Sequence, residues 1–200
     1  MQLYVAGHVS NLRGKLLAKG LMSILRHLQA IVPLPFTATV VIPGLIVYFS
    51  GTTHLGWELP AALWFLPFTL AGLLIALGLI LFGWTVTLFA TVGRGTLAPW
   101  DPTQRLVVLG PYRHVRNPMI SGVLAVLLGE AALLGSLPVF AWFLLFFMLN
   151  HLYIPRFEEP GLDRRFGEDY RRYKQHVPRW LPSLRAWRDL SDTAAPTTDR

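Results

Sequence analysis

The feature that most restricts the fold of this 200-residue sequence is a run of 32 residues, 61–92, without a charged side chain. A second uncharged run covers residues 31–49, and Glu130 is the single Asp, Glu, Lys or Arg in residues 119–154. A helix of about 20 apolar residues crosses the hydrocarbon core of a bilayer. Because a spanning segment must satisfy its own backbone polar groups, the sequence predicts an all-α integral membrane protein.

About four transmembrane helices are expected. Residues 31–49 and 61–92 form the first two, and residues 119–154, broken by Gly-Ser-Leu-Pro, form a tight helical hairpin. No small-residue cleavage pattern follows the first apolar run promptly, so we do not expect a cleaved signal peptide. Four divisions are expected. Residues 1–30 form a basic amphipathic N-terminal segment, and residues 31–92 form the first two membrane helices. Residues 93–182 form the region with the hairpin and most polar motifs, and residues 183–200 form a C-terminal tail.

Basic residues outnumber acidic ones, 18 to 11, and their distribution predicts an orientation. Four precede the first apolar run, four lie in residues 94–116, ten follow the hairpin, and the two other loops have none. Because Lys and Arg mark the cytoplasmic side, both termini and the loop of residues 94–116 should be cytoplasmic. This topology accounts for the positive charge without a nucleic-acid partner. Cysteine is absent, which excludes disulfides and thiolate nucleophiles.

Two polar stretches are candidates for chemistry. In residues 94–118, several Gly and Pro residues predict a shaped loop around a short β-prone run, Arg-Leu-Val-Val-Leu. Arg113, His114 and Arg116 end this loop, where they could contact lipid phosphates as a simple anchor or form a binding site. Glu130, within the third span, either lines a polar site or reaches the interface.

The second stretch, residues 155–182, predicts an amphipathic helix with its basic side toward lipid headgroups. Its apolar positions recur at helical spacing: Leu162, Phe166, Tyr170, Tyr173 and Val177. The adjacent acids Glu158 and Glu159 suggest a cationic ligand. They could equally pair with Arg156 or favour the N-terminus of the helix that follows.

No strand–GxGxxG–helix unit, Walker sequence, HExxH helix or GxSxG elbow is present, so no soluble nucleotide-binding domain or metal site is expected. The motif order is nevertheless specific: "GPYRHVRNPM", a helical hairpin, "EE" and "FGEDYRRYKQHVPRWLP". This arrangement resembles the integral-membrane methyltransferases that include isoprenylcysteine carboxyl methyltransferases and phospholipid N-methyltransferases. The resemblance implies S-adenosyl-L-methionine as methyl donor and a lipid or other hydrophobic acceptor that enters between the helices.

The resemblance also implies site residues. Residues 104–107 would border the donor through their backbone, and Glu158 would bind its ammonium group. Arg113 or Arg116 could face the donor's carboxylate or a lipid phosphate. The complete expected donor site is Gln104, Arg105, Leu106, Val107, Tyr112, Arg116, Asn117, Pro118, Met119, Ile120 and Glu158. An amine acceptor must lose a proton, and Glu159 or His151 is the nearest candidate base.

Two positions depart from the family pattern. Ile120 replaces a common tyrosine, and Ile154 stands where the isoprenylcysteine branch has a substrate-binding arginine. The second departure counts against a prenylcysteine carboxylate as acceptor. Two other readings stay open: an NADPH-dependent enzyme similar to sterol reductases, which share an Arg-Asn-Pro stretch, and a non-catalytic protein whose basic tail docks on anionic lipid.

Overall fold

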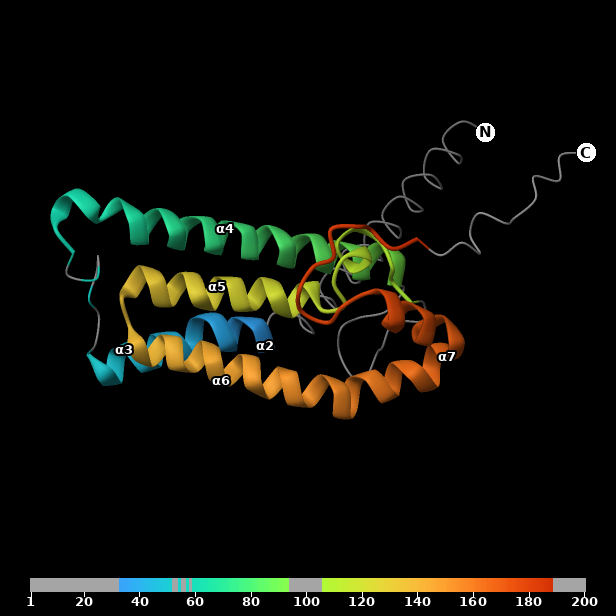
Figure 1. Cartoon of the computed structure of the whole chain (residues 1–200). Coiled ribbons are helices and arrows are strands. Elements are labelled where there is room, and N and C mark those ends of the chain that lie inside the picture. The colour runs from blue at the N-terminus through green and yellow to red at the C-terminus, as the bar shows by residue number, and fades with distance from the viewer. Residues whose placement is uncertain (1–32, 52–53, 55–56, 58, 94–105, 189–200) are drawn as a thin grey trace, which may run out of the picture.

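The computed structural model describes residues 33–51, 54, 57, 59–93 and 106–188 (Figure 1). All regular structure in these residues is helical, which confirms the all-α membrane fold. The α-helices (α) and the short π- or 3₁₀-helical segments (η) are α2 (Pro33–Phe36), η1 (Thr37–Val41), α3 (Ile42–Ser50), η3 (Ala61–Leu63), α4 (Phe65–Leu88), η4 (Phe89–Gly93), η5 (Gly110–Arg113), α5 (Pro118–Leu134), α6 (Leu137–Tyr153), η6 (Ile154–Glu158) and α7 (Glu159–His176).

Three helical stretches are long and apolar enough to cross a membrane: Pro33–Ser50, Phe65–Leu88 and Leu137–His176. The apolar part of the last stretch is α6, and the charged residues of η6 and α7 follow it. The remaining expected span is the third, α5, which has 17 residues. At 1.5 Å per residue this is about 25 Å, slightly less than the roughly 30 Å of a hydrocarbon core.

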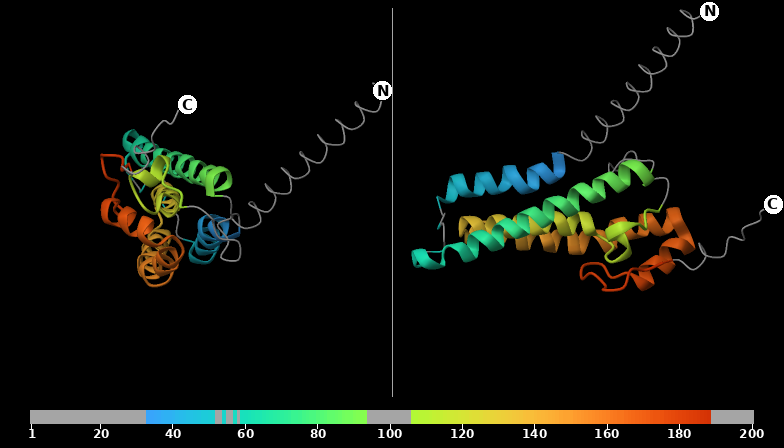
Figure 2. Two further views of the ribbon diagram at one scale, coloured as in Figure 1. Left: turned by 90° about the vertical axis from the view of Figure 1, so that its right-hand side faces the viewer. Right: turned by 90° about the horizontal axis from the view of Figure 1, so that it is seen from above.

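Helix α5 is the centre of the bundle. The end-on view in Figure 2 places it between α4 and α6, with α2 and α3 to one side. About half of its residues are buried, whereas α4 and α6 each bury few. The exposed side chains of α4 and α6 are mostly large and apolar, as expected where lipid is the solvent.

Glycines let α4 and α5 approach until their backbones touch. A Cβ atom on Gly78 would lie 2.6 Å from the Gly122 carbonyl oxygen, and one on Gly122 would lie 2.8 Å from the Gly78 oxygen. About two helical turns further along α5, a Cβ on Gly129 would be 2.7 Å from Ile75 Cγ1. Such small-residue contacts replace the hydrophobic driving force that helices lack within a membrane.

The two ends of the bundle differ in character. At one end, the left-handed Gly135 ends α5, Trp57 Nε1 donates to the Ala132 carbonyl at 2.8 Å, and the His54 amide donates to the Leu134 carbonyl. At the other end lie the polar loop before α5 and the helix α7 (Figure 1). The described parts of the two polar stretches, residues 106–118 and 155–182, therefore meet at one end.

The apolar stripe predicted in residues 155–182 is confirmed, but the helix is shorter and bent. Leu162 and Phe166 pack against a buried cluster of Tyr170, Tyr173 and Val177. The backbone breaks at Gly167, with φ 53° and ψ −125°, so α7 turns back on itself. The expected β-prone run also differs, because residues 106–109 form no strand.

The bend in α7 gives a test of backbone strain. Replacing Gly167 by alanine should lower the free energy of unfolding by about 1–3 kcal/mol, because a side chain is disfavoured at this φ and ψ. No atom lies within 4 Å of a Cβ at Gly167, so steric contact adds nothing. Gly161→Ala is the matched control, because Gly161 is helical and equally open. Thermal unfolding in detergent should show a lower Tm for Gly167→Ala alone; equal Tm values would contradict the prediction.

Candidate functional site

The loop before α5 is tightly shaped where it meets α4. Gly110 has a left-handed φ of 54°, and a Cβ there would lie 3.0 Å from the Trp84 ring. Tyr112, in the short helix η5, is buried and packs edge-to-face on Phe89 at 5.5 Å between ring centroids. Its carbonyl accepts a hydrogen bond of 2.7 Å from the Tyr173 hydroxyl. The loop is thus fixed to both α4 and α7.

After α7 the chain returns along this loop. We call residues 178–187 the C-terminal strap. The Arg116 amide donates to the Pro178 carbonyl at 2.9 Å, the Ser183 amide to the His114 carbonyl at 2.9 Å, and the Trp187 amide to the Arg113 carbonyl at 3.0 Å. The Trp187 ring packs on Tyr173 and His176. The end of the loop, residues 113–116, is therefore hydrogen-bonded to backbone far along the sequence.

Glu159 forms an ion cluster at the start of α7. Its Oε1 accepts from Arg116 Nη1 at 2.9 Å and Arg179 Nε at 2.8 Å, and its Oε2 lies 3.2 Å from Lys174 Nζ. Only 4% of its surface is exposed. Burial alone would raise the pKa of Glu159, but the hydrogen bond from Arg179, the charge of Arg116 and the hydrogen bond from Lys174 hold it below its usual value. The carboxylate is ionised and fully engaged.

Glu158, one residue earlier, has a different environment. Its side chain is accessible to solvent, and within the described part of the chain its carboxylate forms no ion pair. The protein packed around it partly desolvates the group, so burial, together with the Glu159 charge, raises the pKa of Glu158, while Arg165 opposes the shift. Burial also raises the pKa of Tyr112, with contributions from Tyr173 and Glu158. Glu158 is thus a carboxylate that lies near Tyr112 and forms no ion pair with a described residue.

His151, on α6, is held by the strap. The Trp180 indole donates to His151 Nδ1 at 3.1 Å, and the two rings stack. Because an indole N–H can only donate, Nδ1 must accept, and in the neutral ring the proton sits on Nε2. Neither predicted base is therefore arranged as a free base: Glu159 is paired with three cations, and His151 offers its lone pair to Trp180. The catalytic role of Glu159 and His151 stays a prediction, and these contacts are evidence against it.

The other expected site residues gather at the same end of the bundle. Val107 is buried, and Leu106 packs on the Tyr170 cluster. Asn117 precedes α5, and its amide nitrogen lies 3.4 Å from the Arg179 carbonyl. Pro118, Met119 and Ile120 form the first turn of α5. Gln104 and Arg105 lie outside the described residues.

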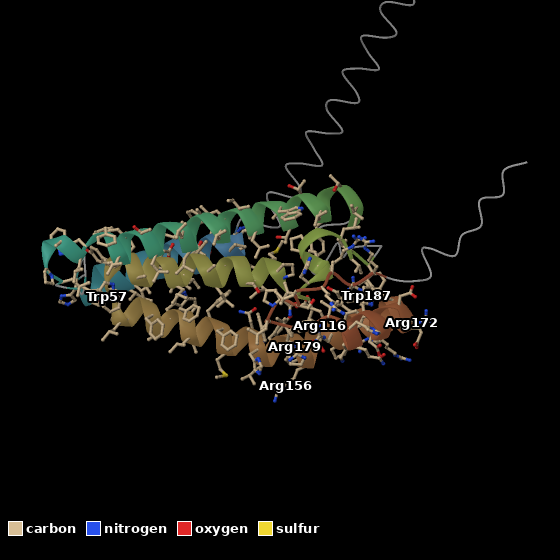
Figure 3. The ribbon with its side chains drawn as sticks, turned by 45° about the horizontal axis from the view of Figure 1, so that its top comes forward. Trp57, Arg116, Arg156, Arg172, Arg179 and Trp187 are labelled. Atoms are coloured by element: carbon tan, nitrogen blue, oxygen red, sulfur yellow. The ribbon has the colours of Figure 1, made fainter. Side chains whose placement is uncertain are left out.

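Sequence reasoning missed the strap and its partners. Arg116, Arg179 and Trp187 gather at the end of the bundle opposite Trp57 (Figure 3). Sequence reasoning assigned no role to Arg179 or Trp180, nor to Lys174 as a partner of Glu159. The available signal was the segment Val-Pro-Arg-Trp-Leu-Pro, in which two prolines rule out a continued helix and frame an Arg-Trp pair.

The similarity of this chain to known proteins identifies its family. The phospholipid methyltransferase family profile matches residues 66–169, just over half of the chain. The chain belongs to the phospholipid methyltransferase family. The match runs from α4 into α7, so it includes the loop, the hairpin and both glutamates, but it ends before Lys174 and the strap.

Among curated relatives of this family member is an uncharacterised protein of Haemophilus influenzae. It is 39% identical over 64 residues, which are 32% of this chain and the whole of that protein. No solved structure matches the chain significantly. The family assignment therefore rests on the profile match, and the position of the site rests on the contacts described above.

Proposed function

We propose that this protein transfers a methyl group from S-adenosyl-L-methionine to a lipid or another hydrophobic molecule in the membrane. The observation that carries the proposal is the family match, which includes the loop, the start of α5 and the Glu158–Glu159 pair. The family match supports methyl transfer, and the sequence resemblance implies that the methyl donor is S-adenosyl-L-methionine. Both O- and N-methylation are compatible with it.

The residues at the loop fit the donor's polar groups. Glu158 is an accessible carboxylate that forms no ion pair among the described residues, as a binding group for an ammonium requires. Arg116 Nε is buried and has no hydrogen-bond partner in the part of the chain that the structure describes. We assign it to the donor's carboxylate or to a lipid phosphate, which a guanidinium binds well. Tyr112 and the first turn of α5 would flank the donor.

The chemistry needs placement more than acid–base groups. When bound, S-adenosyl-L-methionine supplies a methyl group on a positively charged sulfur. The protein's task is to hold the acceptor atom in line with that carbon–sulfur bond and to keep water out. Since Glu159 and His151 are both engaged, an acceptor that carries a proton would have to release it to another group.

We also propose that the site faces the cytoplasm and that the protein is multi-pass with both termini on that side. Arg116, Arg179 and Arg172 lie at the end of the bundle opposite Trp57 (Figure 3), as the rule for basic residues on the cytoplasmic side requires. A lipid acceptor would reach this end from the bilayer between the helices.

Calorimetric titration of the detergent-purified protein tests the donor directly. We expect saturable binding of S-adenosyl-L-methionine and none of NADPH. Trp57→Phe, at the opposite end of the bundle, should bind the donor like the unaltered protein. Binding of NADPH in place of S-adenosyl-L-methionine would contradict the proposal and favour a reductase. Binding of neither ligand by folded protein would favour a non-catalytic role.

A further inference from the structure

We infer that Glu159 is a positioning residue: it holds the C-terminal strap against the loop and thereby fixes the donor-binding residues. The effect on the donor rests on the proposed function, but the attachment of the strap does not. The starting observation is that one carboxylate is shared by cations from three separate segments. Arg116 comes from the loop, Lys174 from α7 and Arg179 from the strap.

A single oxygen joins the loop to the strap. Arg116 Nη1 lies 2.9 Å and Arg179 Nε 2.8 Å from the same Glu159 Oε1. Two guanidinium groups this close repel each other unless an anion lies between them. Among the described residues, Glu159 is the one acid that pairs with either arginine. Removing its charge would therefore push the strap and the loop apart.

The same two segments are also joined through the backbone next to the donor-binding residues. Arg116 is tied to the strap twice, by its side chain through Glu159 and by its amide, which donates to Pro178. Asn117 contacts the Arg179 carbonyl, and the next residue, Pro118, begins α5. A displaced strap would consequently move the first turn of α5, where the donor is expected to bind.

The cluster also explains why two adjacent glutamates differ. Glu159 is buried among three cations, while Glu158 is accessible and unpaired in the described part of the chain. Because the Glu159 carboxylate is fixed from three sides, the backbone that presents Glu158 is fixed with it. Glu158 is thereby left to bind a cationic ligand.

The test compares the full-length unaltered protein with Glu159→Gln by hydrogen–deuterium exchange in detergent. The amides of Ser183 and Trp187, which donate to the loop, should exchange at least tenfold faster in the variant. Glu168→Gln is the matched control: it loses an exposed carboxylate of α7 whose arginine partners are 3.9 Å away, and it should leave these amides unchanged. Unchanged strap exchange in Glu159→Gln would overturn the inference.

A second variant controls for misfolding of the first, because Glu159→Gln leaves two partly buried arginines, Arg116 and Arg179, without their anionic partner. Arg179→Gln removes the strap's contact but keeps Glu159 paired with Arg116 and Lys174, and it should show the same faster exchange. In both variants the KM for S-adenosyl-L-methionine should rise at least tenfold with a smaller change in kcat. Faster strap exchange with unaltered donor affinity would overturn the positioning role. If the unaltered protein binds no donor, the proposed function fails, and the exchange data alone decide the attachment.

Discussion

Replacing Glu158 by glutamine should lower kcat/KM for methyl transfer by about 10- to 100-fold, with most of the loss in donor affinity. A hydrogen bond to a charged group contributes about 1.5–3 kcal/mol, and glutamine keeps the shape of the side chain but not its charge. Glu158 is accessible and forms no ion pair within the described residues, so its carboxylate is available to a cationic ligand. Transfer of a labelled methyl group into a membrane lipid extract, together with donor titration, measures both effects.

The fold should survive this substitution. Glu158 pairs with no described cation, so glutamine leaves no buried arginine or lysine without a partner, and the Tm should stay within a few degrees of the unaltered protein. Glu168→Gln provides the matched control for loss of one negative charge from the same region. Donor binding that is equally tight in Glu158→Gln would show that this carboxylate is not part of the donor site.

Replacing Gly122 by valine should destabilise the bundle by about 3 kcal/mol or more, in the upper range for overpacking. A Cβ there would lie 2.8 Å from the Gly78 carbonyl oxygen and 3.2 Å from the Phe82 amide nitrogen. Both are backbone atoms of α4, so no side chain can rotate to make room, and the two helices must separate. Gly122 is also one turn from the start of α5, so donor binding should weaken as well.

Gly72→Val is the matched control for this prediction. Gly72 lies on α4 with an exposed surface, and no atom is within 4 Å of a Cβ at that position. Unfolding of both variants by titration with a denaturing detergent compares their stability. If Gly122→Val unfolds at the same detergent fraction as Gly72→Val, the close backbone contact between α4 and α5 is not what holds these helices together.

Much of the architecture could be read from local patterns in the sequence. Uncharged apolar runs predicted the helices that became α3, α4, α5 and α6, because a membrane leaves the backbone few alternatives. The helical spacing from Leu162 to Val177 likewise predicted the side chains that pack together in and after α7. The order of the motifs gave the family resemblance that the profile match bears out. The gathering of Tyr112, Arg116 and the two glutamates at one end follows from the same order of helices.

Tertiary structure alone decided which contacts each polar residue makes there. Glu158 and Glu159 are neighbours of one type, and nothing local distinguishes them. Their difference comes from Arg116 and Arg179, which lie 43 and 20 positions from Glu159 along the chain. The strap, the bend at Gly167 and the burial of α5 depend in the same way on segments distant in sequence. Hydrophobic periodicity reports which face of a helix avoids water, whereas ion pairing and close backbone contact depend on which segments meet in space.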